Sequence, residues 1–164
     1  MTKQKKAIFL DRDGVINKKR DDYVKSVDEL EIFQDVGDSI LKLKEMGFLI
    51  IVVTNQSVIN RGIIAVEELE EIHLAIQQNL KEKYCSIDKF YFCPHRPDEN
   101  CECRKPNPGL LLQAINDFCI NASNSWMIGD CLTDIKAGEA VGCKTILMKE
   151  GDSFSEIIRK ISSQ

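Results

Sequence analysis

The sequence has little that would suit a membrane protein or a general nucleic-acid binder. It contains no long apolar run in 164 residues, its net charge is −4, and its start, with Lys3, Lys5 and Lys6, lacks the apolar core of a signal peptide. A transmembrane helix needs about 20 apolar residues, and nucleic acids attract an excess of basic charge. We therefore expect a solvent-exposed N-terminus and no nucleic-acid or membrane partner. A local cluster of lysine and arginine can still bind a small anion.

The seven cysteines have no secretory signal beside them. Thiols stay reduced outside oxidising compartments, so these cysteines predict free thiols or metal ligands in a cytoplasmic protein. The charged fraction of 29% and the hydrophobic fraction of 43% are ordinary for a globular chain. A chain of this length predicts one domain over residues 1–164. We expect a monomer, because no long apolar stripe predicts an obligate oligomer.

Five short runs rich in Ile, Val and Phe are almost continuously apolar, which is typical of strands covered on both faces. These predicted strands span residues 7–10, 49–53, 87–92, 126–128 and 145–148. Helical periodicity predicts helices at residues 36–46, 66–84, 108–118, 132–141 and 154–161. The alternation predicts an α/β fold with a Rossmann-like parallel sheet and helices on both faces. Such sheets bind ligands beyond the carboxyl ends of their strands.

Polar side chains follow four of the predicted strands directly or after one loop. They are Asp11 and Asp13; Thr54, Asn55, Gln56 and Ser57; Arg104 and Lys105; and Asp130 and Asp134. Ionised carboxylates at the end of an apolar strand cost free energy unless a cation lies beside them. We therefore predict that Asp11 and Asp13 are catalytic or metal-binding residues rather than part of the hydrophobic core. A lone acid such as Asp130 could instead be a helix N-cap. Because the groups follow neighbouring strand ends, we expect them to converge.

A second cluster predicts a metal site. Cys93, His95, Cys101 and Cys103 offer three thiolates and an imidazole, a closed tetrahedral set for a structural Zn²⁺. The alternative is free cysteines beside a surface histidine. We predict that the remaining cysteines are buried and behave as small hydrophobic side chains. We predict that His73 and Trp126 are packing residues of the core. Those cysteines are Cys85, Cys119, Cys131 and Cys143.

The strings DRDG, TNQS, RKPNPG and GDCLTD occur in this order, with C-x-H and C-x-C before the third. DxDG alone is only suggestive, but the four strings together are highly specific. Over essentially the whole chain the pattern resembles the haloacid dehalogenase-like (HAD) hydrolases. Within them it is most similar to the branch of heptose bisphosphate and histidinol-phosphate phosphatases. The resemblance implies a HAD fold with no large cap domain and a zinc-binding loop.

The resemblance also implies a Mg²⁺-dependent phosphomonoesterase. Asp11 would be the nucleophile that forms an aspartyl-phosphate, and Asp13 would be the general acid and base. Thr54 and Lys105 would hold the phosphoryl oxygens. The Mg²⁺ ligands would be a carboxylate oxygen of Asp11, the main-chain carbonyl of Asp13 and Asp130, with Asp134 behind them.

A phosphorylated sugar is the substrate that the resemblance implies. By motif, the residues that would grip it are Arg20, Asp21, Asp22, Tyr23, Thr54, Asn55, Gln56, Ser57, Arg104 and Lys105. Three features favour D-glycero-D-manno-heptose 1,7-bisphosphate over histidinol phosphate. They are Tyr23-Val24, Arg61-Gly62, and the continuation of the Arg104-Lys105 pair as Pro106-Asn107-Pro108-Gly109.

Two positions depart from the heptose pattern and leave the substrate open. Cys131 stands where the heptose enzymes typically have lysine, and Val58 stands where glycine is usual. Histidinol phosphate is the nearest alternative substrate. A phosphoacceptor signalling domain is a further alternative, although it has no use for Asp13 as a leaving-group acid. A non-catalytic zinc-binding module would not need the intact acidic set.

Overall fold

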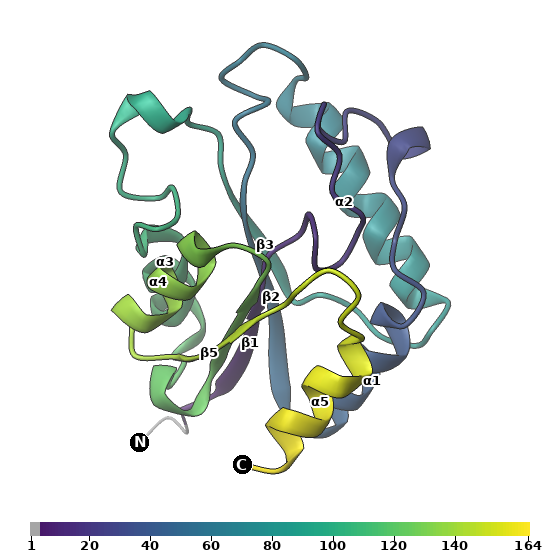
Figure 1. The fold of residues 1–164 in the computed structure, drawn as a ribbon, viewed down its shortest axis with the longest axis vertical. Helices are drawn as coiled ribbons and strands as arrows, with labels where there is room; N and C mark the ends of the chain where they lie inside the picture. Colours follow the sequence, from purple (N-terminus) through teal and green to yellow (C-terminus); the bar gives the residue numbers. More distant parts are fainter. Residues whose placement is uncertain (1–3) are drawn as a thin grey trace.

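The computed structural model describes residues 4–164 and is built on a five-stranded sheet (Figure 1). The strands are β1 (Lys6–Leu10), β2 (Phe48–Asn55), β3 (Lys89–Cys93), β4 (Trp126–Gly129) and β5 (Lys144–Leu147). Their order is β3-β2-β1-β4-β5, and every neighbouring pair is parallel. The strand order reverses between β1 and β4, which is where such sheets bind ligands. The predicted α/β fold is confirmed.

Helices cover both faces of this sheet (Figure 1). They are α1 (Val36–Glu45), α2 (Val66–Lys81) and α5 (Phe154–Ser162) on one face, and α3 (Gly109–Phe118) and α4 (Leu132–Ala140) on the other. Along β1, Ile8 and Leu10 pack into the first core cluster while Ala7 and Phe9 pack into the second. All four side chains are fully buried. Burial on both faces therefore explains why the strand is continuously apolar.

Two neighbouring predicted boundaries are wrong, one by three residues and one by two. The helix predicted over 66–84 ends at Lys81, and the strand predicted from residue 87 begins at Lys89. Tyr84 adopts a left-handed conformation with φ 57°. The Gln77 side chain forms two hydrogen bonds with the backbone of Ile87. It accepts one from the N–H of Ile87 at 2.9 Å and donates one to the carbonyl at 2.7 Å. The other predicted elements are confirmed, with ends that differ by one or two residues.

The cysteines outside the predicted zinc cluster are not all buried. Cys85 and Cys143 are buried, as predicted, but Cys119 is exposed and Cys131 is half-buried. Cys119 caps the end of α3 in a left-handed conformation with φ 54°, so it lies at a turn. Cys131 is the residue before α4, at the carboxyl edge of the sheet. Turn positions, rather than the apolar character of the thiol, set the exposure of these two side chains.

The described N-terminal residues run into the sheet. Lys5 is exposed, as predicted, and Lys3 lies outside the described residues. Lys6 is half-buried instead, because it begins β1 and its Nζ lies over the Phe48 ring, 4.1 Å from the centroid. Among residues 4–164, no helix has both the length and the apolar composition needed to cross a membrane.

Candidate active site

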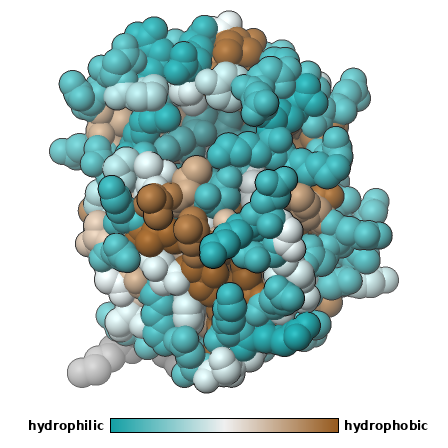
Figure 2. Space-filling view, in the orientation of Figure 1, coloured by the Kyte–Doolittle hydropathy of each residue, from teal (hydrophilic) through white to brown (hydrophobic). Residues whose placement is uncertain are grey.

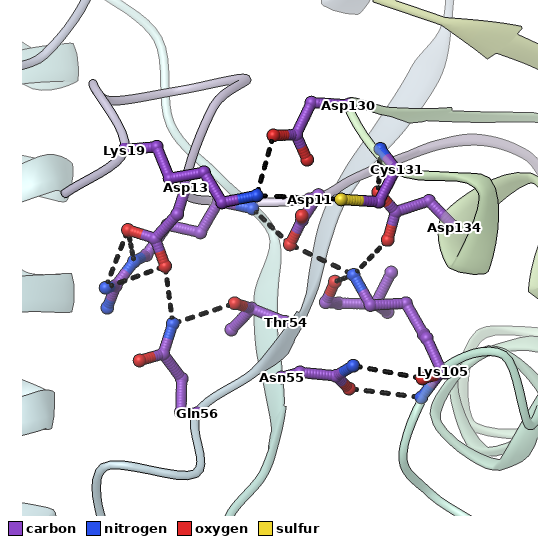
Figure 3. Close-up of polar contacts among 12 residues, drawn as sticks. Asp11, Asp13, Lys19, Thr54, Asn55, Gln56, Lys105, Asp130, Cys131 and Asp134 are labelled. Atoms are coloured by element: carbon purple, nitrogen blue, oxygen red, sulfur yellow. Dashed lines mark hydrogen bonds and ion pairs between the residues drawn. The ribbon is translucent and has the colours of Figure 1, made fainter. Parts of the chain in front are cut away.

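Charged and polar side chains from the ends of four strands or the segments after them meet at the carboxyl edge of the sheet (Figure 3). Asp11 follows β1, Lys105 comes from the loop after β3, and Asp134 belongs to the first turn of α4. Lys105 Nζ lies 3.0 Å from Asp11 Oδ1 and 2.7 Å from Asp134 Oδ1. It also donates a hydrogen bond of 2.7 Å to the Val53 carbonyl. The structure thus joins three of the four motifs through one buried ammonium group.

Lys105 is held from both of its ends. Its main-chain N–H donates to Asn55 Oδ1 and its carbonyl accepts from Asn55 Nδ2, both at 3.1 Å. Burial by itself would lower the pKa of Lys105, but the carboxylates of Asp11 and Asp134 outweigh burial and raise it. The side chain is therefore a fixed, charged ammonium group beside Asp11.

The Asp11 carboxyl is poorly solvated. Burial raises its pKa to about 7, although the Lys105 ammonium opposes that rise. The N–H of Arg12 donates to Asp11 Oδ1 at 2.8 Å and helps to orient it. A further cation beside Asp11 would favour its ionised, nucleophilic form.

Asp13 forms hydrogen bonds and an ion pair with a different set of partners (Figure 3). The Arg12 guanidinium lies 3.0 and 3.1 Å from its two oxygens, and Asn17 and Gln56 each donate a bond of 2.9 Å. Burial alone would raise the pKa of Asp13, but Arg12 and these hydrogen bonds hold it below its usual value. Gln56 also donates to Thr54 Oγ1 at 2.9 Å. Asp13 is thus ionised and linked to Thr54 through one amide.

Arg12 and His73 complete this support, and the sequence did not single out either for the site. Arg12 is fully buried, and its Nη1 lies 3.4 Å from His73 Nε2. The His73 ring stacks on Phe90 with centroids 4.4 Å apart. Burial, and then the Arg12 charge, lower the pKa of His73 to about 3, so the ring is neutral. Arg12 could have been suspected from its place between two acids, but no sequence signal pairs it with His73.

A His73→Gln variant tests this neutral histidine. In the unfolded chain the imidazole regains its ordinary pKa of 6.5, so it binds a proton there as the pH falls while the folded ring does not. Folded-state stability is therefore lost below pH 6.5, by about 2 kcal/mol between pH 7.5 and pH 5. We expect urea unfolding to show a loss smaller by about that amount in the variant. Equal losses in both proteins would contradict a neutral His73.

Asp130 presents an oxygen atom that the described residues leave without a hydrogen bond. Its Oδ1 is buried and has no partner in that part of the chain. Gly14 approaches so closely that a Cβ there would lie 2.3 Å from Asp130 Oδ2, and its φ of 87° also favours glycine. The Gly14 turn therefore holds Asp130 beside the loop that carries Asp11 and Asp13. Such a set of hard oxygen atoms fits Mg²⁺.

The predicted zinc ligands lie together after β3. Sγ of Cys103 lies 3.0 Å from Sγ of Cys93 and 3.6 Å from that of Cys101, and the latter two are 3.6 Å apart. His95 Nδ1 lies 3.2 Å from Cys103 Sγ and 3.4 Å from Cys93 Sγ. Ligand atoms on a tetrahedral zinc would be about 3.5 to 3.8 Å apart. The observed separations of 3.0 to 3.6 Å lie in or somewhat below that range, and three thiols with one imidazole are a donor set that fits a four-coordinate Zn²⁺ with no open position.

The predicted substrate-binding loop makes most of its contacts within itself. Arg20 Nε lies 3.0 Å from Asp22 Oδ1, and Lys25 Nζ lies 2.7 Å from Asp22 Oδ2. Tyr23 adopts a left-handed conformation with φ 66°. Asp21, in contrast, lines a hollow of about 1000 Å³ that also borders Asp130. Asp21 thus borders a hollow beside Asp130, whereas Arg20 pairs with Asp22 within the loop itself.

A second hollow, of about 390 Å³, is bordered by Lys105, Asn55 and Arg104. Arg104 Nη1 donates to the His95 carbonyl at 3.0 Å, so the Cys/His loop orients this guanidinium. Ser57 is buried and accepts a bond of 3.2 Å from Arg61 Nε. In Figure 2 the loops beyond the strand ends form a mainly hydrophilic surface, and the apolar surface gathers lower on this face. A polar ligand suits such a surface.

Comparison with known proteins relates the chain to phosphatases. A family model described as HAD-hydrolase-like matches residues 102–163. The D-glycero-beta-D-manno-heptose-1,7-bisphosphate 7-phosphatase of Neisseria meningitidis serogroup A is 42% identical over 146 residues, which cover 89% of this chain and 78% of that protein. The protein of the same name from Yersinia pestis is 41% identical over 159 residues, covering 92% and 84%.

A solved structure agrees with these relatives. The D,D-heptose 1,7-bisphosphate phosphatase of B. bronchiseptica, complexed with magnesium and phosphate, matches with a TM-score of 0.89 and 28% identity over 96% of this chain and 98% of that one. Within residues 4–164, no cap domain is inserted between the elements of the sheet. The matched regions extend over most of both chains. The chain therefore belongs to the D-glycero-D-manno-heptose 1,7-bisphosphate phosphatase family of the HAD-like hydrolases.

Proposed function

We propose that this protein removes the 7-phosphate from D-glycero-D-manno-heptose 1,7-bisphosphate. Two relatives that carry this activity in their names are 41% and 42% identical to this chain. The observation that carries the proposal is the buried Lys105 ammonium, 3.0 Å from Asp11 Oδ1 at the point where the strand order reverses. A carboxylate nucleophile and a fixed cation for the phosphoryl oxygens are what such a hydrolysis needs.

In the first step an oxygen of Asp11 attacks phosphorus, and the bond from phosphorus to the sugar oxygen breaks. Asp13 gives that leaving oxygen a proton. Arg12 keeps Asp13 ionised in the ligand-free site, but a dianionic phosphate beside it would raise its pKa by like-charge repulsion, so that a proton is available. Thr54 and Lys105 hold the phosphoryl oxygens as negative charge develops on them.

In the second step Asp13, now ionised, accepts a proton from water, and the oxygen of that water attacks phosphorus. The bond between phosphorus and Asp11 breaks, which releases inorganic phosphate and restores the carboxylate. The sugar has already left in the first step, as a heptose monophosphate. The Asp13 proton is therefore donated once and regained once in each cycle.

The proposed cation site consists of a carboxylate oxygen of Asp11, the main-chain carbonyl of Asp13, and Asp130. Mg²⁺ bound there would supply the positive charge that lets the Asp11 carboxylate approach a dianionic phosphate. The chain's own contribution is to fix these oxygens. Gly14 holds Asp130 in place, and the Arg12 N–H orients Asp11.

We also propose that Cys93, His95, Cys101 and Cys103 bind one structural Zn²⁺. The ligand spacing supports it, and the next two residues after Cys103 are Arg104 and Lys105. A site rich in thiolates fits a reducing compartment, so we propose a cytoplasmic location. We propose further that residues 1–164 form one domain that acts as a monomer.

The substrate contacts are proposed from the same geometry. Residues 20–23 and 54–57, together with Arg104 and Lys105, would surround the substrate. Asp21 and Arg104 are the strongest candidates, since each borders one of the two hollows beside the site. The ion pair between Arg20 and Asp22 would shape the loop that carries Asp21.

A substrate panel tests this function. Purified protein with Mg²⁺ would be assayed on both anomers of the heptose bisphosphate, on histidinol phosphate and on p-nitrophenyl phosphate. We expect kcat/KM for one heptose anomer to exceed that for histidinol phosphate by about 100-fold or more, because the polar hollows fit a hydroxylated sugar. Faster turnover of histidinol phosphate would overturn the proposed substrate. No turnover of any compound would favour a non-catalytic zinc module.

A further inference from the structure

Lys19 contacts the proposed cation site directly (Figure 3). Its Nζ lies 3.1 Å from Asp130 Oδ2 and 3.5 Å from Cys131 Sγ. Its two basic neighbours pair with other acids, since Lys18 pairs with Glu31 and Arg20 pairs with Asp22, although Lys18 also borders the hollow beside Asp130. Of three consecutive basic residues, Lys19 is therefore the one that reaches Asp130 within the described part of the chain.

The contact between Lys19 and Asp130 is suited to exchange. The Lys19 side chain is 56% exposed, whereas the Asp130 side chain is only 17% exposed. Ion pairs with one exposed, flexible partner are weak. Asp130 is meanwhile fixed against Gly14, and its second oxygen is buried without a partner in residues 4–164. A rigid carboxylate thus has a mobile monovalent cation beside it, which a divalent ion can replace.

The position of Lys19 also suggests where its ammonium goes when it leaves Asp130. Lys19 borders the 1000 Å³ hollow, together with Gly14, Asp21 and Asp130. The neighbouring Cys131 offers only a thiol, so it brings no positive charge to this rim. A bisphosphate bound with one phosphate at Asp11 has to place its other phosphate outside that site. A second dianionic group needs a cation, and ammonium groups bind phosphates well.

We propose that Lys19 is an exchangeable cation, whose ammonium leaves Asp130 when Mg²⁺ binds and then binds the phosphate that is not hydrolysed. The second half of this proposal rests on the proposed function, while the first half does not. Lys19 would in this way favour substrates with two phosphates over simple monophosphates. It would also weaken the binding of Mg²⁺ to the site when no substrate is bound.

The test compares Lys19→Met with Lys18→Met, which removes a neighbouring charge that pairs with Glu31 instead. Mg²⁺ alone would be titrated calorimetrically into each zinc-loaded protein, without substrate. We expect Lys19→Met to bind Mg²⁺ about two- to fivefold more tightly than the wild type, because no ammonium competes for Asp130. Lys18→Met should differ from the wild type by less than twofold.

The second readout is discrimination between substrates, measured at saturating Mg²⁺. We expect the ratio of kcat/KM for the heptose bisphosphate to that for p-nitrophenyl phosphate to fall about tenfold in Lys19→Met, mainly through KM for the bisphosphate. Lys19→Arg, which keeps the charge, should retain most of the ratio.

Each half of the proposal has its own contrary result. Unchanged or weaker Mg²⁺ binding by Lys19→Met overturns the displacement of its ammonium from Asp130. An unchanged ratio, or an equal loss in Lys19→Arg and Lys19→Met, overturns the binding of the second phosphate. If the wild-type protein does not hydrolyse the bisphosphate, the proposed function and this second half are wrong together. The calorimetric titration still decides the first half in that case.

Discussion

Replacing Asp11 by asparagine will lower kcat by about 10⁴-fold or more while the protein remains folded. The asparagine amide keeps the shape of the side chain but does not attack phosphorus, so no aspartyl-phosphate forms. Turnover of the heptose bisphosphate and of p-nitrophenyl phosphate should be lost together, because both need the same nucleophile. The measurement is kcat at saturating Mg²⁺ for both substrates.

The Asp11→Asn protein should also be at least as stable as the wild type in buffer without Mg²⁺. Burial raises the pKa of Asp11 from 3.8 to about 7 in the fold, so the folded state binds the proton more tightly than the unfolded chain. This group therefore adds stability as the pH falls from 7 toward 4, and its ionised form costs free energy above pH 7. A neutral amide removes that cost, so at pH 8 the melting temperature should be unchanged or higher.

Asp13→Asn is the matched control, because it alters the other acid of the same motif. Its pKa is held low by the buried Arg12 guanidinium, so its charge stabilises the fold above pH 4. Removing that charge leaves Arg12 buried without its carboxylate and should cost about 3 kcal/mol of unfolding free energy. A large loss of stability in Asp11→Asn would contradict the conclusion that the ionised Asp11 carboxylate destabilises the fold. No loss of stability in Asp13→Asn would contradict the conclusion that the Asp13 carboxylate stabilises it.

Much of the site can be predicted because a simple rule connects the sequence with the sheet. Residues that follow parallel strands reach one edge, so Asp11 and Lys105 could be expected together although they are far apart in the chain. Because both residues follow predicted parallel strands, the sequence predicted that they would lie near each other. It did not predict that one ammonium would bridge Asp11 and Asp134.

The contacts that sequence reasoning missed depend on side-chain direction. Arg12 lies between two acids in sequence, and only the fold determines that its guanidinium turns to Asp13 and to His73. The Gln77 side chain holds Ile87 away from the predicted strand through two hydrogen bonds that no periodicity indicates. The sequence does not distinguish the three basic residues at positions 18–20. The structure shows that Lys19 is the one that contacts Asp130.

Removing one zinc ligand should have the second large effect. We expect about one equivalent of zinc in the wild-type protein by elemental analysis and little in Cys103→Ser. Loss of the metal leaves a polar loop without its central crosslink, so the melting temperature should fall sharply. Cys119→Ser is the control, because Cys119 is an exposed thiol outside the cluster, and it should keep both zinc and stability.

The kinetic consequence of losing zinc should fall on KM more than on kcat. Lys105 has anchors of its own, through Asn55 at its backbone and through Asp11 and Asp134 at its ammonium. Arg104 instead donates to the His95 carbonyl, so its position depends on the loop that the metal would hold. We expect kcat/KM for the bisphosphate to fall about 10- to 100-fold in Cys103→Ser, mainly through KM. A zinc-free variant with wild-type KM and melting temperature would show that the cluster does not position Arg104.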